Sequence, residues 1–99
     1  MVGAVEDITI QPTENPDCRV YNTRYELCSA PERGCRGEPS ELGEFGCLVL
    51  DFRGVVCVTL LPYMMIVIKA PLFHWEEVEP KILELLSDFV RSQRLIDVA

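Results

Sequence analysis

Stretches rich in apolar and β-branched residues, some with a period of two, predict four strands in this chain. Residues 8–11 alternate apolar and polar, and residues 19–27 are rich in Tyr, Val and Thr. Two further β-rich runs, residues 55–60 and 64–69, are separated only by Leu61-Pro62-Tyr63. Because this link is short and contains a proline, the two runs are expected to form an antiparallel hairpin.

Two other segments have the spacing of three and four residues between apolar positions that is typical of an amphipathic helix. The first is expected to begin near Ser40, a favourable N-cap residue, and to end at Gly54 in a left-handed conformation. The second begins near Trp75, and Pro80 is expected within its first two turns, since a proline further along would kink the helix. Its predicted apolar face consists of Val78, Ile82, Leu85 and Phe89.

The order strand, strand, helix, strand, strand, helix predicts an α+β two-layer sandwich, with a four-stranded antiparallel sheet and two helices on one face. A chain of 99 residues has room for one core, so residues 1–99 are expected to form a single domain. Residues 28–39, with two glycines, two prolines and four charges, are expected to form a loop. The predicted core consists of Phe45, Val49, Phe52, Val58, Val67, Ile82, Leu85 and Phe89.

Composition and charge exclude some classes of function. Sixteen acidic and nine basic residues give a net charge of −7, which disfavours nucleic-acid binding, because that depends on many Lys and Arg contacts to phosphates. No apolar stretch approaches the roughly 20 residues that cross a membrane, so no membrane contact is expected. The first seven residues lack the basic flank and apolar run of a secretion signal, and a cytoplasmic location is therefore expected.

Five cysteines, an odd number, are present without any Cys-x-x-Cys motif, so free thiols are expected in a reducing cytosol. Cys18, Cys28 and Cys35 lie close together in the sequence beside several arginines, and positive charge lowers the pKa of a thiol. They are candidate ligands for iron, zinc or an iron–sulfur cluster. The alternative is three unrelated thiols, because the spacings are long for a metal site. Cys47 and Cys57 are expected to be packing residues.

No catalytic motif is present, and an enzyme is not expected. The chain has one histidine, His74, which stands just before the second predicted helix and is interpreted as a surface or capping residue. The chain has no Gly-rich phosphate loop and no His-Glu-x-x-His or Gly-x-Ser-x-Gly motif. The acidic residues that follow His74 are explained by the positive end of the helix dipole.

Several short motifs occur in a particular order: Asn15-Pro16 within residues 11–17, Gly54-Val55, Leu61-Pro62-Tyr63, Lys69, and Trp75 followed by Glu79-Pro80-Lys81-Ile82. In this order they resemble the N-terminal domain of Nfu/NifU-like iron–sulfur cluster scaffold proteins. The resemblance implies the same sheet with two helices on one face, and a part in passing clusters to recipient proteins. In that family a Cys-x-x-Cys in a separate C-terminal domain holds the cluster, and this chain does not contain that motif. An accessory, recognition or assembly role is therefore expected, for a stand-alone protein or a fragment of a longer one, with iron or an iron–sulfur cluster as the associated cofactor.

The second half of the predicted hairpin, residues 64–68, is apolar without a break. If Met65 and Val67 face the helices, then Met64, Ile66 and Ile68 form an apolar stripe on the open face of the sheet. The stripe is interpreted as a surface for scaffold or recipient proteins, or for a second copy of the chain. The alternative is that residues 28–39 fold over the sheet and cover it.

The sequence therefore predicts a non-catalytic interaction domain that acts in iron–sulfur cluster assembly or delivery. Two alternatives remain open. One is a thiol-based metal- or redox-responsive protein that uses Cys18, Cys28 and Cys35. The other is a purely structural dimerisation module.

Overall fold

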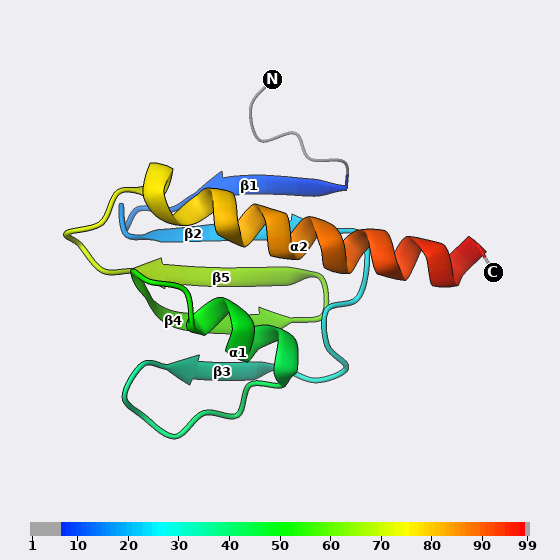
Figure 1. Cartoon of the computed structure of the whole chain (residues 1–99), viewed down its shortest axis with the longest axis horizontal. Coiled ribbons are helices and arrows are strands. Elements are labelled where there is room, and N and C mark those ends of the chain that lie inside the picture. Colours follow the sequence, from blue (N-terminus) through cyan, green and yellow to red (C-terminus); the bar gives the residue numbers. More distant parts are fainter. Residues whose placement is uncertain (1–6, 99) are drawn as a thin grey trace.

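The computed structural model describes residues 7–98, and the side chains of residues 7–93. Within this part of the chain five strands and two helices follow one another: β1 (Ile8–Pro12), β2 (Cys18–Thr23), β3 (Glu32–Cys35), α1 (Glu44–Leu50), β4 (Val55–Leu61), β5 (Met64–Lys69) and α2 (Trp75–Val98). Both helices lie on the same face of the sheet (Figure 1). The predicted α+β class with two helices and an antiparallel sheet is confirmed, but the sheet has five strands where four were expected. None of the described helices is long and apolar enough to cross a membrane.

The strands form one sheet in the order β1-β2-β5-β4-β3, and all neighbours are antiparallel. The predicted hairpin is formed by β4 and β5, where Leu61 pairs with Met64. Strand β2 pairs with β5, so that the first hairpin joins the second at the centre of the sheet (Figure 1). The four predicted strands therefore form a continuous sheet.

Strand β3 lies within residues 28–39, which were expected to form a loop. Its four residues, Glu-Arg-Gly-Cys, have no strand-like alternation, yet they pair with β4 along the edge of the sheet. Gly34 is buried here because Ser40 and Leu42 pack against it: a Cβ atom at Gly34 would collide with Ser40 Oγ and lie 2.7 Å from Leu42 Cδ1. The strand exists because its partner β4 offers a free edge, which is a tertiary cause that the local sequence does not show.

Helix α1 begins later than predicted. Its N-cap is Gly43, and the backbone N–H of Gly43 donates a hydrogen bond to Glu32 Oε1 at 2.9 Å. The hydroxyl of Ser40, the predicted cap, instead accepts a hydrogen bond from the backbone N–H of Leu42 at 3.0 Å in the preceding turn. Edge strand β3 therefore supplies the carboxylate beside the first turn, where the helix dipole favours negative charge.

The C-terminal end of α1 is also tied to the residue after β3. The guanidinium of Arg36 donates hydrogen bonds to the carbonyl oxygens of Leu50 at 2.6 Å and Phe52 at 2.9 Å, which occupies carbonyls that a helix end leaves unpaired. Gly54 has the predicted positive φ, +94°. It lies three residues after the C-cap Asp51, so it shapes the turn into β4 and is not the cap itself.

Helix α2 begins as expected. The backbone N–H of His74 donates to Glu77 Oε2 at 3.1 Å, and the N–H of Glu77 donates to the His74 carbonyl at 2.9 Å. The Glu77 carboxylate thus provides one half of a capping box, whereas His74 contributes its backbone carbonyl and not its side chain. The His74 side chain is exposed, as expected for a surface residue. Pro80 is the sixth residue of the helix, within its second turn as predicted.

The core lies between the sheet and the helices. Four of the eight predicted core residues, Val49, Val58, Val67 and Ile82, are completely buried, and the other four (Phe45, Phe52, Leu85 and Phe89) are partly buried against them. On α2 the fully buried line of side chains is Val78, Ile82, Leu86 and Val90. Leu85 and Phe89, which were expected in this line, lie nearer to α1, and the rings of Phe45 and Phe89 are 4.8 Å apart.

Candidate interaction surface

The face of the sheet opposite the helices carries the predicted apolar stripe. Along β5 buried and half-buried residues alternate: Met65 and Val67 are completely buried beneath the helices, whereas Met64, Ile66 and Ile68 are half-buried on the other face. This alternation follows from the period of two in a strand. The predicted orientation of all five side chains is therefore confirmed.

The strand register widens this stripe into a patch. Val20 of β2 lies opposite Ile66, and Leu61 of β4 lies opposite Met64. We call Val20, Leu61, Met64, Ile66 and Ile68 the open-face patch. Polar residues border most of it, since Thr9, Gln11, Asn22 and Thr59 occupy neighbouring register positions. At Ile68 the neighbours are Cys18 of β2 and Cys57 of β4. Among the described strand residues on this face, the charged one is Arg33, on the edge strand β3.

No described helix or strand covers the open-face patch (Figure 1). Residues 28–39 were the alternative cover, but within them residues 32–35 extend the sheet sideways as β3. Because the edge of the sheet takes up this segment, it does not form a third layer. The alternative is wrong, and the patch remains at the surface of the part of the chain that the structure describes.

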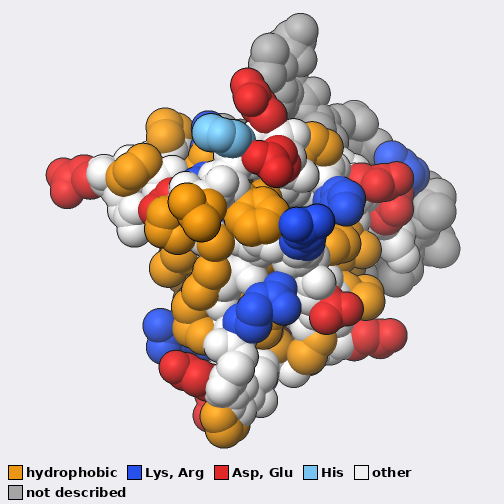
Figure 2. Space-filling model, turned by 60° about the vertical axis from the view of Figure 1, so that its left-hand side comes forward, with side chains coloured by type: hydrophobic (Ala, Val, Ile, Leu, Met, Phe, Trp, Pro, Cys, Tyr) orange, Lys and Arg blue, Asp and Glu red, His pale blue; other side chains and the backbone are white. Residues whose placement is uncertain are grey.

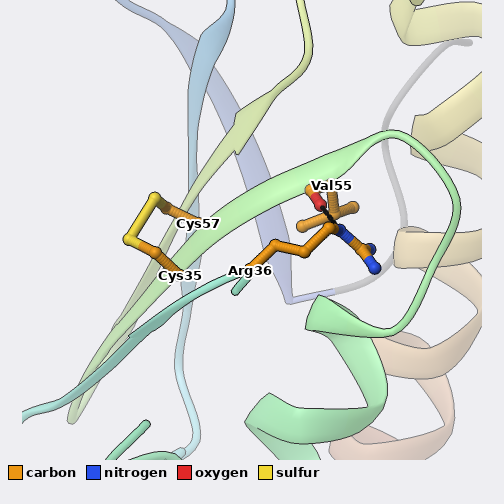
Figure 3. Close-up of a disulfide and its surroundings, with 4 residues drawn as sticks. All are labelled: Cys35, Arg36, Val55 and Cys57. Carbon is orange, nitrogen blue, oxygen red and sulfur yellow. Dashed lines mark hydrogen bonds between the residues drawn. A yellow bond between two sulfur atoms is a disulfide. The ribbon is translucent and has the colours of Figure 1, made fainter. Parts of the chain in front are cut away.

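Two of the five cysteines are joined, contrary to the expectation of free thiols. Cys35 and Cys57 form a disulfide that links β3 to β4 (Figure 3). The register places the two residues opposite one another with their Cα atoms 4.1 Å apart, so both side chains leave the sheet on the same face. Cys57 is therefore a cross-link and not only a packing residue. Arg36 lies beside the bridge and donates to the Val55 carbonyl at 2.9 Å (Figure 3).

The predicted metal ligands Cys18, Cys28 and Cys35 do not come together. Cys18 and Cys35 are at the same end of the sheet, but β5 and β4 separate their strands, and three strand spacings amount to about 14 Å. Cys28 follows Leu27, whose N–H donates to the Pro62 carbonyl at the opposite end of the sheet. In the described part of the chain no group of three His, Cys, Asp or Glu residues is arranged to hold a metal ion.

The surroundings of Cys28 also oppose the predicted thiolate chemistry. Burial raises the pKa of the Cys28 thiol, and the neighbouring charges of Glu32 and Glu26 raise it further. Nearby arginines were expected to lower the pKa of these thiols, but the charges close to Cys28 are the carboxylates of Glu32 and Glu26. The residues present therefore do not fit an iron or iron–sulfur ligand set, and Cys18, Cys28 and Cys47 are free cysteines.

The turn between β1 and β2 contains Asn15 and Pro16, two residues of the family-like motif. Asn15 Oδ1 accepts a hydrogen bond from the Asp17 N–H at 2.9 Å, and the Pro16 carbonyl accepts one from Trp75 Nε1 at 2.8 Å. The carboxylate of Asp17 pairs with the buried ammonium of Lys69 at 2.6 Å. Residues that carry the resemblance thus meet at one end of the sheet. Figure 2 shows hydrophobic side chains beside Lys and Arg side chains at this end.

The same end contains an ionic cluster with a structural role. Glu79 Oε1 accepts hydrogen bonds from Arg19 Nη1 at 2.7 Å and from the Tyr21 hydroxyl at 2.8 Å. The Arg19 guanidinium lies 4.8 Å from the centre of the Trp75 ring. Burial, followed by the hydrogen bond to Glu79, raises the pKa of Tyr21 far above its ordinary value. These groups satisfy one another, so the cluster ties β2 to α2 and offers no free acid or base.

Known proteins match this chain in fold and not in sequence. Neither a protein-family model nor a curated protein sequence matches it. The crystal structure of protein SAV1430 from Staphylococcus aureus superimposes with a TM-score of 0.66 at 18% sequence identity, covering 82% of this chain and 99% of that one. At this identity the likeness shows the fold alone, and the chain is similar to SAV1430 in the arrangement of its sheet and helices.

Proposed function

We propose that this protein is a non-catalytic interaction domain that acts in iron–sulfur cluster assembly or delivery, in the manner of the N-terminal domain of Nfu/NifU-like scaffold proteins. The observation that carries the proposal is the open-face patch. It is apolar and central in the sheet, and its five residues bear no charge although the whole chain has a net charge of −7. The motifs that resemble the scaffold family support it, because they form the turn between β1 and β2 and link this turn to the start of α2.

The size of the face favours a transient contact. A sheet of five strands is about 24 Å wide and, with strands of about six residues, about 20 Å long, so the face measures about 500 Å². A stable interface of standard size buries about 800 Å² on each partner. Full burial of an exposed Ile or Val side chain contributes about 1.5–3 kcal/mol, and each patch residue gains less than this on binding because it is already half-buried. The patch is therefore suited to reversible binding. Cluster delivery requires this reversibility.

The partner is a scaffold or recipient protein with a flat, uncharged apolar surface. The cluster is cargo in this proposal, and the partner holds it, because this chain contains no Cys-x-x-Cys motif and its described residues offer no group of three ligands.

We also propose the cytoplasm as the location. Thiols there are kept largely reduced, so Cys35 and Cys57 are expected as a pair of thiols in that compartment and as the disulfide under oxidising conditions.

The test compares the wild-type protein with the double variant Ile66→Thr, Ile68→Thr. Threonine is favourable in strands, so the sheet is retained while the patch becomes polar, and circular dichroism checks the fold. Binding to a purified cluster-loaded scaffold protein and to an apo-ferredoxin is measured by calorimetry, and cluster transfer by visible absorption. The matched control is Leu72→Thr, since Leu72 is 92% exposed and lies outside the patch.

We expect the wild type and the Leu72 variant to bind one of the two proteins, and the double variant to bind at least tenfold more weakly. Absence of binding by the wild type contradicts the proposed function. Light scattering tests whether a second copy of the chain occupies the patch. A wild-type protein that is a dimer and a double variant that is a monomer would identify a structural dimerisation module instead.

A further inference from the structure

A second apolar surface lies on the opposite side of the molecule, between the two helices. It is a groove of about 470 Å³ whose floor is formed by Phe45 and Leu48 of α1 and by Leu85 and Phe89 of α2. We call it the interhelix groove. It shares no residue with the open-face patch, and the inference drawn from it is independent of the proposed function.

The groove results from two apolar lines on α2. The buried line, Val78 to Val90, packs on the sheet, whereas Leu85 and Phe89 form a second line directed toward α1. Helix α1 has seven residues and α2 has twenty-four, so α1 covers only part of that second line. Leu48, on the α1 side of the groove, is 49% exposed. Within the side chains that the structure describes, residues 7–93, an exposed leucine next to two half-buried phenylalanine rings is an apolar surface without a partner.

The rim of the groove is acidic on both sides. Glu44 stands at the start of α1, and Asp88 stands on α2. Residues 37–51, which contain α1 and the segment before it, include four acidic residues and no Lys or Arg. Within residues 7–93, Asp88 pairs with Arg91 of its own helix, and both side chains are more than 60% exposed, so this pair is readily exchanged for another cation.

We infer that the interhelix groove binds a cationic amphipathic helix of a partner protein. Leu or Phe side chains of that helix enter the floor of the groove, and flanking Lys or Arg side chains pair with Glu44 and Asp88. A second copy of this chain is the wrong occupant, because each copy has a net charge of −7 and would place acidic residues against the acidic rim. The charge of the rim thus selects for a basic partner.

The probe is a synthetic, fluorescently labelled peptide of Lys and Leu whose leucines fall on one face of a helix. Two control peptides are a scrambled sequence of the same composition and a version with Glu in place of Lys. Binding is measured by anisotropy at several salt concentrations, and the site is mapped by amide chemical shifts. We expect shifts confined to α1 and α2, weaker binding as the salt concentration rises, and at least tenfold weaker binding of both control peptides.

Two variants locate the interaction. Leu48→Ser removes a half-exposed side chain without opening the core and is expected to weaken binding about tenfold. The double variant Glu44→Gln, Asp88→Asn is expected to weaken binding and reduce its salt dependence. Leu72→Ser and Glu14→Gln, exposed changes outside the groove, should leave it unchanged. Equal binding of the scrambled peptide, shifts that map to the open-face patch, a dimer that Leu48→Ser dissociates, or no binding at all would each overturn the inference.

Discussion

The buried hydroxyl of Tyr21 allows a prediction whose sign changes with pH. The side chain is completely buried, and its hydroxyl donates to the same Glu79 oxygen that Arg19 binds. Tyr21→Phe keeps the ring and removes only the hydroxyl. At pH 7 this loses a hydrogen bond to a charged acceptor, so we expect the free energy of unfolding to fall by about 1.5–3 kcal/mol.

At alkaline pH the same hydroxyl lowers the free energy of unfolding of the wild type. Burial and Glu79 raise the pKa of Tyr21 far above that of a tyrosine in the unfolded chain, which is about 10. Below a pH of about 10, the pKa of tyrosine in the unfolded chain, the hydroxyl contributes its full stabilisation. As the pH rises above that value this stabilisation is lost, because the unfolded state releases the proton first. The loss is about 1.4 kcal/mol for each pH unit. The advantage of the wild type over Tyr21→Phe should therefore disappear about one to two pH units above 10.

The assay is urea unfolding between pH 7 and 12, followed by circular dichroism and by the fluorescence of Trp75, the one tryptophan of the chain. Tyr63→Phe is the matched control, since Tyr63 is 55% exposed, and its difference from the wild type should stay flat across this range. A wild-type advantage over Tyr21→Phe that remains constant from pH 9 to 12 would refute the argument, because it would mean that the fold does not hold this hydroxyl neutral.

Two further predictions concern the edge strand. Gly34→Ala introduces a methyl group that collides with Ser40 Oγ and lies 2.7 Å from Leu42 Cδ1, and this overpacking is expected to lower the free energy of unfolding by about 1–3 kcal/mol in urea titrations; an unchanged value would show that the segment before α1 does not pack closely on β3. The double variant Cys35→Ser, Cys57→Ser opens a cross-link with a sequence separation of 22 and should lose about 3 kcal/mol. Alkylation and mass spectrometry of the unreduced wild type should modify three of the five cysteines, and modification of all five would contradict the bridge.

Both predictions concern β3 because it connects several parts of the fold. Its Glu32 contacts the start of α1, Arg36 just after it binds the end of α1, and Cys35 fastens it to β4. The positions of α1 and of one wall of the interhelix groove therefore depend on an edge strand of four residues. When the Cys35–Cys57 bridge is reduced, β3 and α1 are expected to be the first elements to unfold locally.

The sequence by itself determined the elements whose signal lies in neighbouring residues. The period of two in a strand predicted that Met65 and Val67 share one face of the sheet and that Met64, Ile66 and Ile68 share the other, and the burial pattern confirms this, because in a strand the side-chain direction is a local property. The sequence did not decide which of these faces meets the helices, because all five residues are apolar. Both helices were predicted for the same reason, since their apolar positions recur every three or four residues.

Only the tertiary structure decided what depends on partners far apart in the sequence. Strand β3 has no local signal and forms because β4 presents a free edge, and the register between them brings Cys35 opposite Cys57. The candidate metal ligands Cys18, Cys28 and Cys35 lie apart in the fold, because closeness in sequence does not place strands next to each other in a sheet. The wide apolar face of α2 was likewise compatible with two packings, and contact with the sheet and with α1 decided which line of side chains became core and which became the groove.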